Sequence, residues 1–295
     1  MDVVDEIMPK SDANDKKSYN NKYSTKKQNN WQEQQNKDRK AIYDLIEKNA
    51  KEVRDNGEKF KEYLDIQSRF TKYSVGNCLV ILEKAPNSTQ IKDAKSWKEK
   101  GIELIENPKG FKILEPSKSN GKTYYNPKMV YDISQTTAEN HEPIVNYGDR
   151  RLIEALLHNC QVPRKAVDTL SNGEIGSEYD KENNVLYVCK GMDRETLFQT
   201  LSQEISKIEL NDNENKNMQD FISYCNSYMI CKRYGIDVSN YNFENLPDEI
   251  TTKQDGKSIR AELNAIKDNF EKVNSRMLDY FDVSSNEKKK VVPER

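Results

Sequence analysis

The sequence predicts an α+β protein in which a domain of helices and a small antiparallel sheet precedes a mostly helical domain with a short hairpin. Three observations support this prediction. The chain has 295 residues, which is enough for two ordinary domains. Apolar residues recur at helical spacing in both halves of the chain. Between these runs lie short strand-like segments that are bounded by Pro, Gly and Asn turns.

Helices dominate the first part of the chain. Residues 1–30 contain little that could form a core, so we expect a disordered tail there. Further on, Asn56-Gly57 ends the first helical run and Pro86 ends the last one. The helices expected in this part cover residues 31–53, 58–73 and 75–84.

A small sheet is expected next, after a short helix in DAKSWKEKG that ends at Gly101. The run IELIENPKGFKILEP predicts two strands joined by a Pro-Gly turn, and GKTYYNPKMVYDIS predicts another strand pair. The first domain therefore spans residues 31–136. The polar residues 137–148 are expected to form a linker.

The second domain is expected over residues 149–285, with a loose tail over residues 286–295. It begins with an amphipathic helix in DRRLIEALLHNC, and a hairpin follows in GSEYDKENNVLYVCKG. Three more helices complete it. Their expected caps are Asp193 before the first, Gly235 after the second and Ser258 before the long C-terminal helix.

Composition excludes several classes of protein. No apolar run approaches the ~20 residues of a membrane span, and no signal-type segment begins the chain, so we expect a cytoplasmic protein. The five cysteines are widely spaced without a C-x-x-C pair, which indicates reduced thiols. Only two histidines occur, His141 and His158, and neither has a partner at metal-ligand spacing. We therefore expect no cofactor.

Charge is unevenly distributed along the chain. Residues 1–135 contain 26 Lys and Arg against 21 Asp and Glu, whereas the remainder contains 21 against 28. Residues 66–128 alone hold 12 basic and 6 acidic residues. A basic first half fits a polyanionic partner, and a lysine-rich solvated surface explains the same counts equally well.

Single-stranded nucleic acid requires cations for its phosphates and flat side chains for its bases, and both kinds interleave between residues 69 and 131. Trp97 lies beside three lysines. Two roles are compatible with its ring, packing in the core and stacking on a base. The amide of Asn77, in an apolar helix, needs a backbone or a base as its partner. The candidate DNA-binding residues are Arg69, Lys72, Tyr73, Asn77, Trp97, Lys98, Lys100 and Lys112.

Two blocks in the first half resemble a known family. They are YSVGNCLVILEKAPNSTQIKDAKSWKEKGIELIENPKGFKILEP (residues 73–116) and VYDISQT (residues 130–136). Their order and spacing resemble the single-stranded-DNA-binding domain of ArdC-type antirestriction proteins, which plasmids, phages and conjugative elements carry. The resemblance covers residues 35–136. It departs from the family in the short turn over residues 106–110, which implies a weaker phosphate contact there.

The second half resembles the metallopeptidase-like domain of the same family in the order of its elements and in the block ICKRYGIDVSNYNF. The stretch QTLSQEISKIEL (residues 199–210) takes the place of the active-site helix. Such a helix needs H-E-x-x-H, in which two histidines bind zinc and the glutamate polarises a water molecule. Here the register gives Gln203, Glu204 and Lys207, and Tyr224 takes the third ligand position on the next helix.

These four residues are a poor set of zinc ligands. An amide binds zinc weakly, and a charged ammonium has no lone pair to donate. Glu204 and Lys207 can instead pair at i, i+3, which stabilises the helix slightly. The resemblance therefore implies a helix that keeps the fold without binding a metal, and a domain that is not an enzyme.

Three functions are compatible with these features. The leading one is a cytoplasmic antirestriction-like protein of a mobile element or phage that binds single-stranded DNA and counters a host nuclease defence or protects entering DNA. The alternative is an inhibitor whose acidic second half docks on a restriction or CRISPR-type protein complex. The third is an active metallopeptidase, against which the ligand losses argue. For the leading function, loss of Lys98 or Lys112 is expected to weaken DNA binding.

Overall fold

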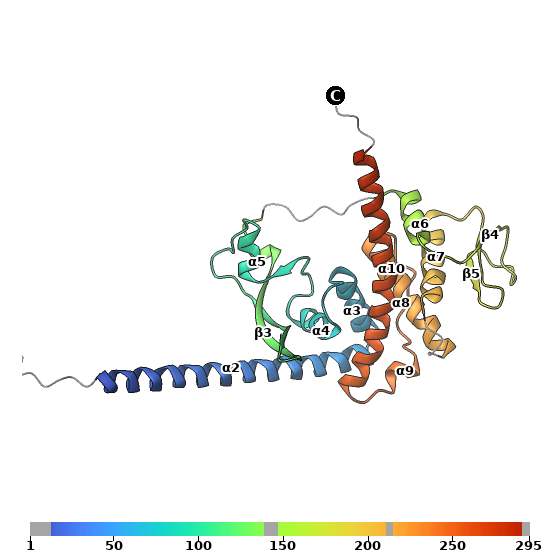
Figure 1. Ribbon diagram of the computed structural model, residues 1–295. Helices are drawn as coiled ribbons and strands as arrows, with labels where there is room; N and C mark the ends of the chain where they lie inside the picture. Colours follow the sequence, from blue (N-terminus) through green and yellow to red (C-terminus); the bar gives the residue numbers. More distant parts are fainter. Residues whose placement is uncertain (1–12, 139–146, 211–214, 291–295) are drawn as a thin grey trace, which may run out of the picture. The chain divides into compact units, whose positions relative to one another are not determined.

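The computed structural model describes residues 13–138, 147–210 and 215–290, and it confirms the α+β class (Figure 1). The elements in the first half are α2 (Ala13–Asp55), α3 (Gly57–Arg69), α4 (Val75–Lys84), β1 (Ile91–Lys92), α5 (Ala94–Glu99), β2 (Phe111–Ser119), β3 (Lys122–Asp132) and the 3-10 helix η1 (Ile133–Gln135). Those in the second half are α6 (Asp149–Leu157), β4 (Arg164–Val167), β5 (Ser177–Asp180), β6 (Val185–Cys189), α7 (Arg194–Ile208), α8 (Lys216–Tyr234), α9 (Asp248–Thr251) and α10 (Gly256–Lys290).

The chain divides into two compact units. Unit 1 consists of Met1–Asp44 and Lys112–Met129, and unit 2 consists of Leu45–Phe111 and Val130–Arg295. Unit 2 therefore holds helices from both sides of the linker expected at residues 137–148, most of which lies outside the described residues. The boundary between residues 136 and 137 stays a prediction.

Unit 1 combines the first part of α2 with the outer part of the β2–β3 ribbon. The Arg39 Nε atom donates a hydrogen bond to the Tyr125 carbonyl oxygen at 2.8 Å, and the Lys112 ammonium lies 2.5 Å from the Asp38 carboxylate. The structure assigns helix from Ala13 onward, where the composition predicts a disordered tail. Lys, Gln and Asn do not prevent a helix, although they provide no apolar stripe.

Unit 2 is built around long helices. α7 packs on α8, α10 packs on α6, α8 and α4, and α3 packs on α8. The α3–α8 contact includes aromatic rings, since the ring of Phe60 lies 5.6 Å from that of Phe221, and Phe243 from the segment after α8 adds a third ring 5.7 Å from Phe60. These rings remove a large apolar area from water, which is the main stabilising contribution to such a core.

Helix ends follow the local signals in most places. Asp193 accepts the N–H of Thr196 at the start of α7, and Gly235 adopts a left-handed conformation with φ of 71° after α8, as predicted. The cap of α10 is a correction. The predicted N-cap was Ser258. In the structure the capping group is the Asp255 carboxylate, which accepts the backbone N–H of Ser258 at 2.9 Å. A carboxylate is the stronger acceptor at this position.

The first sheet has the order β1-β3-β2, and β1 pairs antiparallel with the last two residues of β3. GKTYYNPKMVYDIS forms one continuous strand rather than the predicted pair. Pro127 fits within it because β1 pairs only with Tyr131 and Asp132, so the pairing with β1 needs no backbone N–H at the proline. The strand predicted in IELIENP is reduced to an isolated bridge between Leu104 and Thr136.

The second sheet has the order β4-β6-β5. The predicted hairpin is present as the antiparallel pair of β5 and β6, and β4 adds a parallel strand that the sequence analysis did not predict. Its short run, Arg164–Val167, is mostly exposed and lacks the apolar alternation of a half-buried strand. No helix in the described ranges is both long enough and apolar enough to cross a membrane.

Candidate functional site

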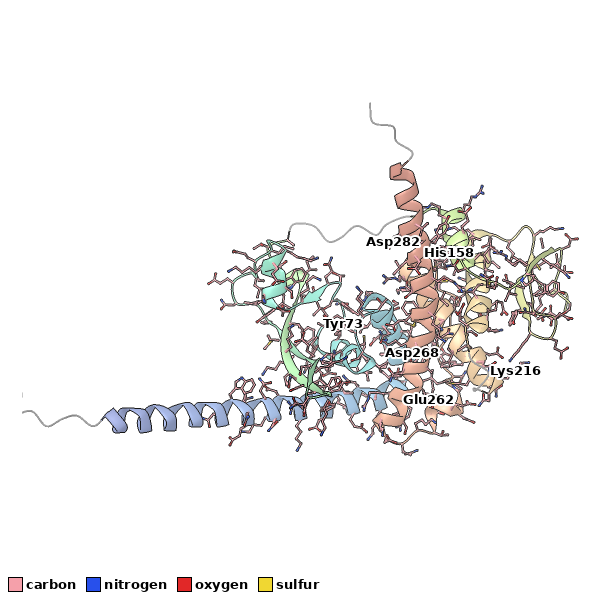
Figure 2. All side chains as sticks on the ribbon, in the orientation of Figure 1. Tyr73, His158, Lys216, Glu262, Asp268 and Asp282 are labelled. Atoms are coloured by element: carbon pink, nitrogen blue, oxygen red, sulfur yellow. The ribbon has the colours of Figure 1, made fainter. Side chains whose placement is uncertain are left out.

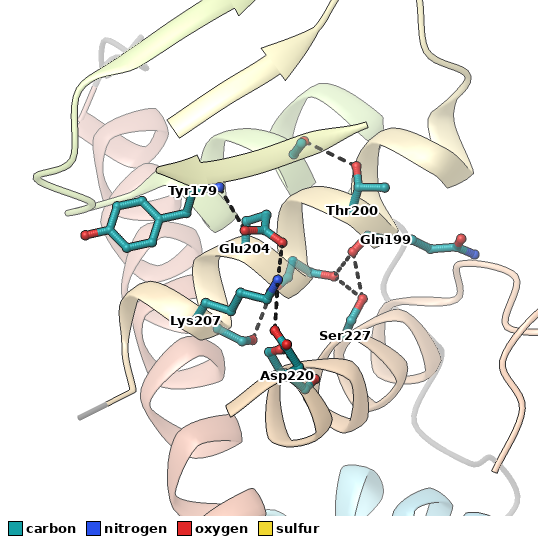
Figure 3. Close-up of polar contacts among 11 residues, drawn as sticks. Tyr179, Gln199, Thr200, Glu204, Lys207, Asp220 and Ser227 are labelled. Atoms are coloured by element: carbon teal, nitrogen blue, oxygen red, sulfur yellow. Dashed lines mark hydrogen bonds and ion pairs between the residues drawn. The ribbon is translucent and has the colours of Figure 1, made fainter. Parts of the chain in front are cut away.

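The helix α7 places a buried carboxylate against the second sheet. Glu204 is 7% exposed, and its Oε2 atom accepts the backbone N–H of Tyr179 in β5 at 2.8 Å (Figure 3). Leu201 and Ile205 are buried on the same helix, so their packing fixes the face from which Glu204 projects. This carboxylate is therefore a structural acceptor that ties α7 to β5.

A lysine ammonium joins this carboxylate to α8. The Nζ atom of Lys207 lies 2.8 Å from Glu204 Oε1 and 3.3 Å from Asp220 Oδ1 (Figure 3). Burial lowers the pKa of Lys207, but the two carboxylates outweigh it and leave the pKa above its ordinary value. The side chain is therefore charged at neutral pH. One cation bridges two helices and pairs with two carboxylates.

The residue of α8 that faces this cluster is Asp220, not Tyr224. The Tyr224 hydroxyl accepts the backbone N–H of Asn242 at 2.8 Å, and its ring packs against Phe243 at 5.4 Å. Asp220 precedes Tyr224 by one helical turn and thus lies on a neighbouring part of the same face. The assignment of Tyr224 to the third ligand position stays a prediction, and Asp220 is the residue of α8 that contacts Lys207. The acidic residue Asp220, four positions before Tyr224, was the signal in the sequence for this contact. Gln203, half-buried beside Glu204, completes the predicted set.

A divalent ion does not fit this group of side chains. Its members would be an amide, two carboxylates and an ammonium, and the ammonium already occupies the position between the carboxylates. In the part of the chain that the structure describes, no group of three or more His, Cys, Asp or Glu side chains is placed to hold a metal ion. His158 contacts Asn159 and Tyr280, and His141 lies outside the described residues.

Buried hydroxyls lie behind the charged cluster. The Ser227 Oγ atom lies 2.7 Å from both Ser202 Oγ and the Gln199 carbonyl oxygen, and 2.6 Å from the Tyr241 hydroxyl. These bonds satisfy polar groups that would be costly to bury alone. They fix the register of α7 against α8, and with it the position of Lys207 opposite Asp220.

Two of the candidate DNA-binding residues belong to the interior of unit 2. Trp97 is 1% exposed, and its Nε1 atom donates to the Tyr131 carbonyl oxygen at 3.1 Å. Base stacking needs an accessible ring face. Trp97 is therefore a core residue, and the prediction that it could serve as a stacking platform is corrected. Asn77 is 6% exposed on α4, which removes its amide from contact with a base.

The other candidates are more accessible. Tyr73 is half-buried and donates from its hydroxyl to the Ile91 carbonyl oxygen, beside α3 and α4 (Figure 2). Lys72, Lys98 and Lys100 are exposed in unit 2. Lys112 lies in unit 1, where its ammonium pairs with Asp38 and holds the pKa of that carboxyl below its ordinary value. The ammonium of Lys112 is therefore engaged in an ion pair that joins β2 to α2.

A groove of about 960 Å³ lies in unit 2 between the end of α3, the loop after α4 and the end of α8. We call it the α3–α8 groove. Two acidic residues, Glu62 and Asp65, also line it. Its cationic lining residues are Lys59, Arg69, Lys232 and Arg233.

The two guanidinium groups of the groove are held by backbone oxygens. Arg69 donates to the Pro86 carbonyl oxygen at 2.5 Å, and Arg233 donates to the Ser68 carbonyl oxygen at 2.9 Å. These bonds orient the side chains without cancelling their charge. Burial lowers the pKa of Arg69, although an arginine stays charged at any physiological pH. Oriented guanidinium groups suit a phosphate, which they can bind with two parallel hydrogen bonds.

The lysines of the groove are paired. Lys59 contacts Glu62 at 2.7 Å, and Lys232 contacts Asp65 at 3.2 Å. Asp65 also accepts the Tyr228 hydroxyl at 2.6 Å, which ties α3 to α8. Sequence reasoning selected only Arg69 of these cations. The Lys-Arg dipeptide before Gly235 was the signal for the others, but it lies far from Arg69 along the chain.

Together, the fold and the two sites define a class of protein. It is an α+β protein in which an ammonium bridges two carboxylates on a helix pair, beside a groove that carries oriented guanidinium groups. The sequence matches no protein-family model and no curated protein.

Among solved structures, the chain is similar to the antirestriction protein ArdC from plasmid R388. The Mn(II)-bound ArdC structure has a TM-score of 0.46 and 13% identity, covering 70% of this chain and 85% of ArdC. The metal-free ArdC structure has a TM-score of 0.42 and 12% identity, covering 70% of this chain and 86% of ArdC. ArdC is also the family that the sequence blocks resemble.

Proposed function

We propose that this protein binds single-stranded DNA and acts as an antirestriction-like protein of a mobile element or phage, in the cytoplasm. The observation that carries the proposal is the pair of oriented guanidinium groups, Arg69 and Arg233, in the α3–α8 groove. The interleaved cationic and aromatic sequence and the resemblance of residues 35–136 to the ArdC-type domain support it.

The α3–α8 groove suits a nucleic-acid backbone better than a neutral ligand. Its four cations exceed its two acids, and each lysine has one of those acids as a partner. The net positive charge therefore resides on the two arginines. The exposed Asn87 and Thr89, which also line the groove, offer polar groups that can bind sugars or phosphates. A strand lying here would release counterions, so its affinity would fall as salt rises.

The proposal includes a peptidase-like domain that does not catalyse. Hydrolysis by a zinc peptidase needs a metal-bound water and a free carboxylate beside it. Glu204 is committed to Tyr179 and Lys207, and Lys207 is committed to both carboxylates. The domain then contributes to function as a scaffold, since α8 supplies Lys232 and Arg233 to the groove.

Fluorescence anisotropy with labelled single-stranded and duplex oligonucleotides across a salt series tests the proposal. Single strands are expected to bind more tightly. The double variant Arg69→Ala, Arg233→Ala is expected to reduce the slope of log affinity against log salt by about 1.4, since each phosphate contact contributes about 0.7. The charge-conserving variant Arg69→Lys, Arg233→Lys is expected to keep most of the slope.

A matched control removes two exposed cations outside the groove, Arg150 and Lys190, each of which pairs with a carboxylate. The variant Arg150→Ala, Lys190→Ala is expected to retain both affinity and slope. Binding that does not depend on salt, or an equal loss in the control, would remove the α3–α8 groove from the proposal. If neither oligonucleotide binds at low salt, the alternative of a protein-binding inhibitor takes its place, to be tested by inhibition of a purified restriction enzyme.

A further inference from the structure

We propose that Trp31 in unit 1 is a stacking site for an unpaired nucleobase. Its side chain is 62% exposed, and it lines a groove of about 330 Å³ together with Gln32, Gln35, Asn36, Arg39 and Asn126. We call this groove the Trp31 site. The inference rests on the proposed function, because it assigns a second part of the chain to the same class of ligand.

The spacing of these residues builds the Trp31 site on one side of α2. Trp31, Gln35 and Arg39 are four residues apart, so they lie along one face of the helix. Gln32 and Asn36 form the neighbouring row on that face. Asn126, from β3, lines the same groove in unit 1. The indole ring therefore has amide groups beside it rather than apolar side chains.

The floor of the Trp31 site is fixed by one arginine. Arg39 donates from Nη1 to Asn36 Oδ1 at 2.9 Å and from Nη2 to Asn126 Oδ1 at 3.1 Å. Its Nε atom donates to the Tyr125 carbonyl oxygen at 2.8 Å. All three guanidinium nitrogens thus donate, and the Asn36 and Asn126 amides are held in defined positions before any ligand arrives. Such preorganisation lowers the entropic cost of binding.

Core packing does not account for Trp31. The segment WQEQQNKDRK, residues 31–40, contains no other apolar residue, so no apolar stripe continues from the ring along the helix. The ring itself remains mostly in water. A tryptophan in such a setting exposes a large flat face at an energetic cost, which a ligand that covers it would recover.

The chemistry around the ring selects a nucleobase over an apolar partner. A base has a flat face for the indole and donors and acceptors on its edge for amide groups, and glutamine and asparagine can form paired hydrogen bonds with it. Tyr124, two residues before Asn126 in β3 and thus on the same face of that strand, is also exposed, at 48%. Consecutive bases of a single strand can use such neighbouring rings.

Intrinsic fluorescence tests the proposal directly, because the chain has only two tryptophans. Trp97 is buried and Trp31 is exposed, so the difference in emission between the native chain and Trp31→Phe isolates Trp31. Titration with oligo-dT and oligo-dA is expected to quench this difference signal. An abasic oligomer of the same length and charge is expected to leave it unchanged.

Affinity gives the second readout. Trp31→Ala in the full chain is expected to weaken single-strand binding by about 5- to 150-fold, the range for one stacked base. Trp31→Phe is expected to retain most of the affinity. Tyr43→Ala, which removes another exposed aromatic from α2, is expected to change it by less than about twofold.

The two proposals fail in different ways. If anisotropy shows saturable binding while the Trp31 signal stays constant and Trp31→Ala binds like the native chain, the Trp31 site is overturned and the α3–α8 groove stands. If the abasic oligomer quenches as strongly as oligo-dT, stacking is overturned. If the native chain binds no single strand at all, the proposed function and the Trp31 site both fall.

Discussion

The Lys207 ammonium lies 2.8 Å from the Glu204 carboxylate, one turn along α7. The resemblance of this stretch to a zinc-peptidase helix predicts the second histidine ligand and the catalytic glutamate at these two positions. Here they form an ion pair that a second carboxylate, Asp220, extends to α8. Lys207 thus supplies one fixed positive charge between two carboxylates on neighbouring helices.

Lys207→Met is expected to lower the free energy of unfolding by about 1–2 kcal/mol, which urea denaturation would measure. The change leaves Glu204 buried and Asp220 nearby without their shared cation, and the partial exposure of Lys207 keeps the cost below that of a fully buried pair. As a control, Lys190→Met breaks an exposed pair with Asp168 and is expected to cost less than about 0.5 kcal/mol. Equal transition midpoints for the two variants would show that the bridge contributes no special stability.

The double variant Gln203→His, Lys207→His is expected to bind one zinc ion per chain. It restores two imidazoles one helical turn apart, with Asp220 as the third ligand. At zinc concentrations of about 100 times Kd, binding adds about 2.7 kcal/mol of stability, which raises Tm by several degrees. A chelator should reverse the increase, and the native chain should show none. No zinc-dependent shift in the double variant would mean that Asp220 is not oriented toward the shared site.

Asp132→Asn is expected to destabilise unit 2 by about 1–3 kcal/mol, the cost of leaving a buried donor unsatisfied. Asp132 is 8% exposed, and its carboxylate accepts the backbone N–H groups of Thr89, Gln90 and Ser134. An amide would present its NH₂ group to some of these donors. Asp180→Asn, at an exposed carboxylate bonded to Asn183, serves as the control in the same thermal unfolding measurement. A similar Tm for both variants would contradict the prediction.

The same carboxylate predicts a pH dependence. Burial would raise the pKa of Asp132, but hydrogen bonds from Ser134, Thr89 and Gln90 outweigh it and hold the pKa below the ordinary value of 3.8. A carboxyl whose pKa is depressed by folding contributes stability above its unfolded pKa and loses it as pH falls through the folded pKa. Native stability should therefore fall below about pH 3.8 more steeply than that of Asp132→Asn. Parallel profiles between pH 5 and pH 2.5 would contradict this.

Local signals in the sequence predicted many of the helices and their ends. Asp193 and Gly235 cap α7 and α8 as expected, because a cap depends on a few neighbouring backbone groups. The apolar spacing of α10 was equally readable, since a helical face is a local property. The extra strand β4 was not, because its partner β6 lies about twenty residues further along the chain and β4 itself lacks apolar alternation.

The candidate sites also combine features that the sequence predicted with features that only the structure showed. The sequence alone predicted that Gln203 and Lys207 are poor zinc ligands, because ligand chemistry belongs to the residue type. It could not decide that Asp220, rather than Tyr224, meets Lys207, nor that Trp97 is buried while Trp31 is exposed.

Residue types and local spacing thus predicted the α+β class and the caps of α7 and α8. Only the tertiary structure brought Arg69 and Arg233 to one groove and surrounded Trp31 with amides from α2 and β3. The physical reason is that a binding surface depends on which side chains packing leaves in water and side by side. That outcome is set by contacts between segments distant in sequence, which no local pattern records.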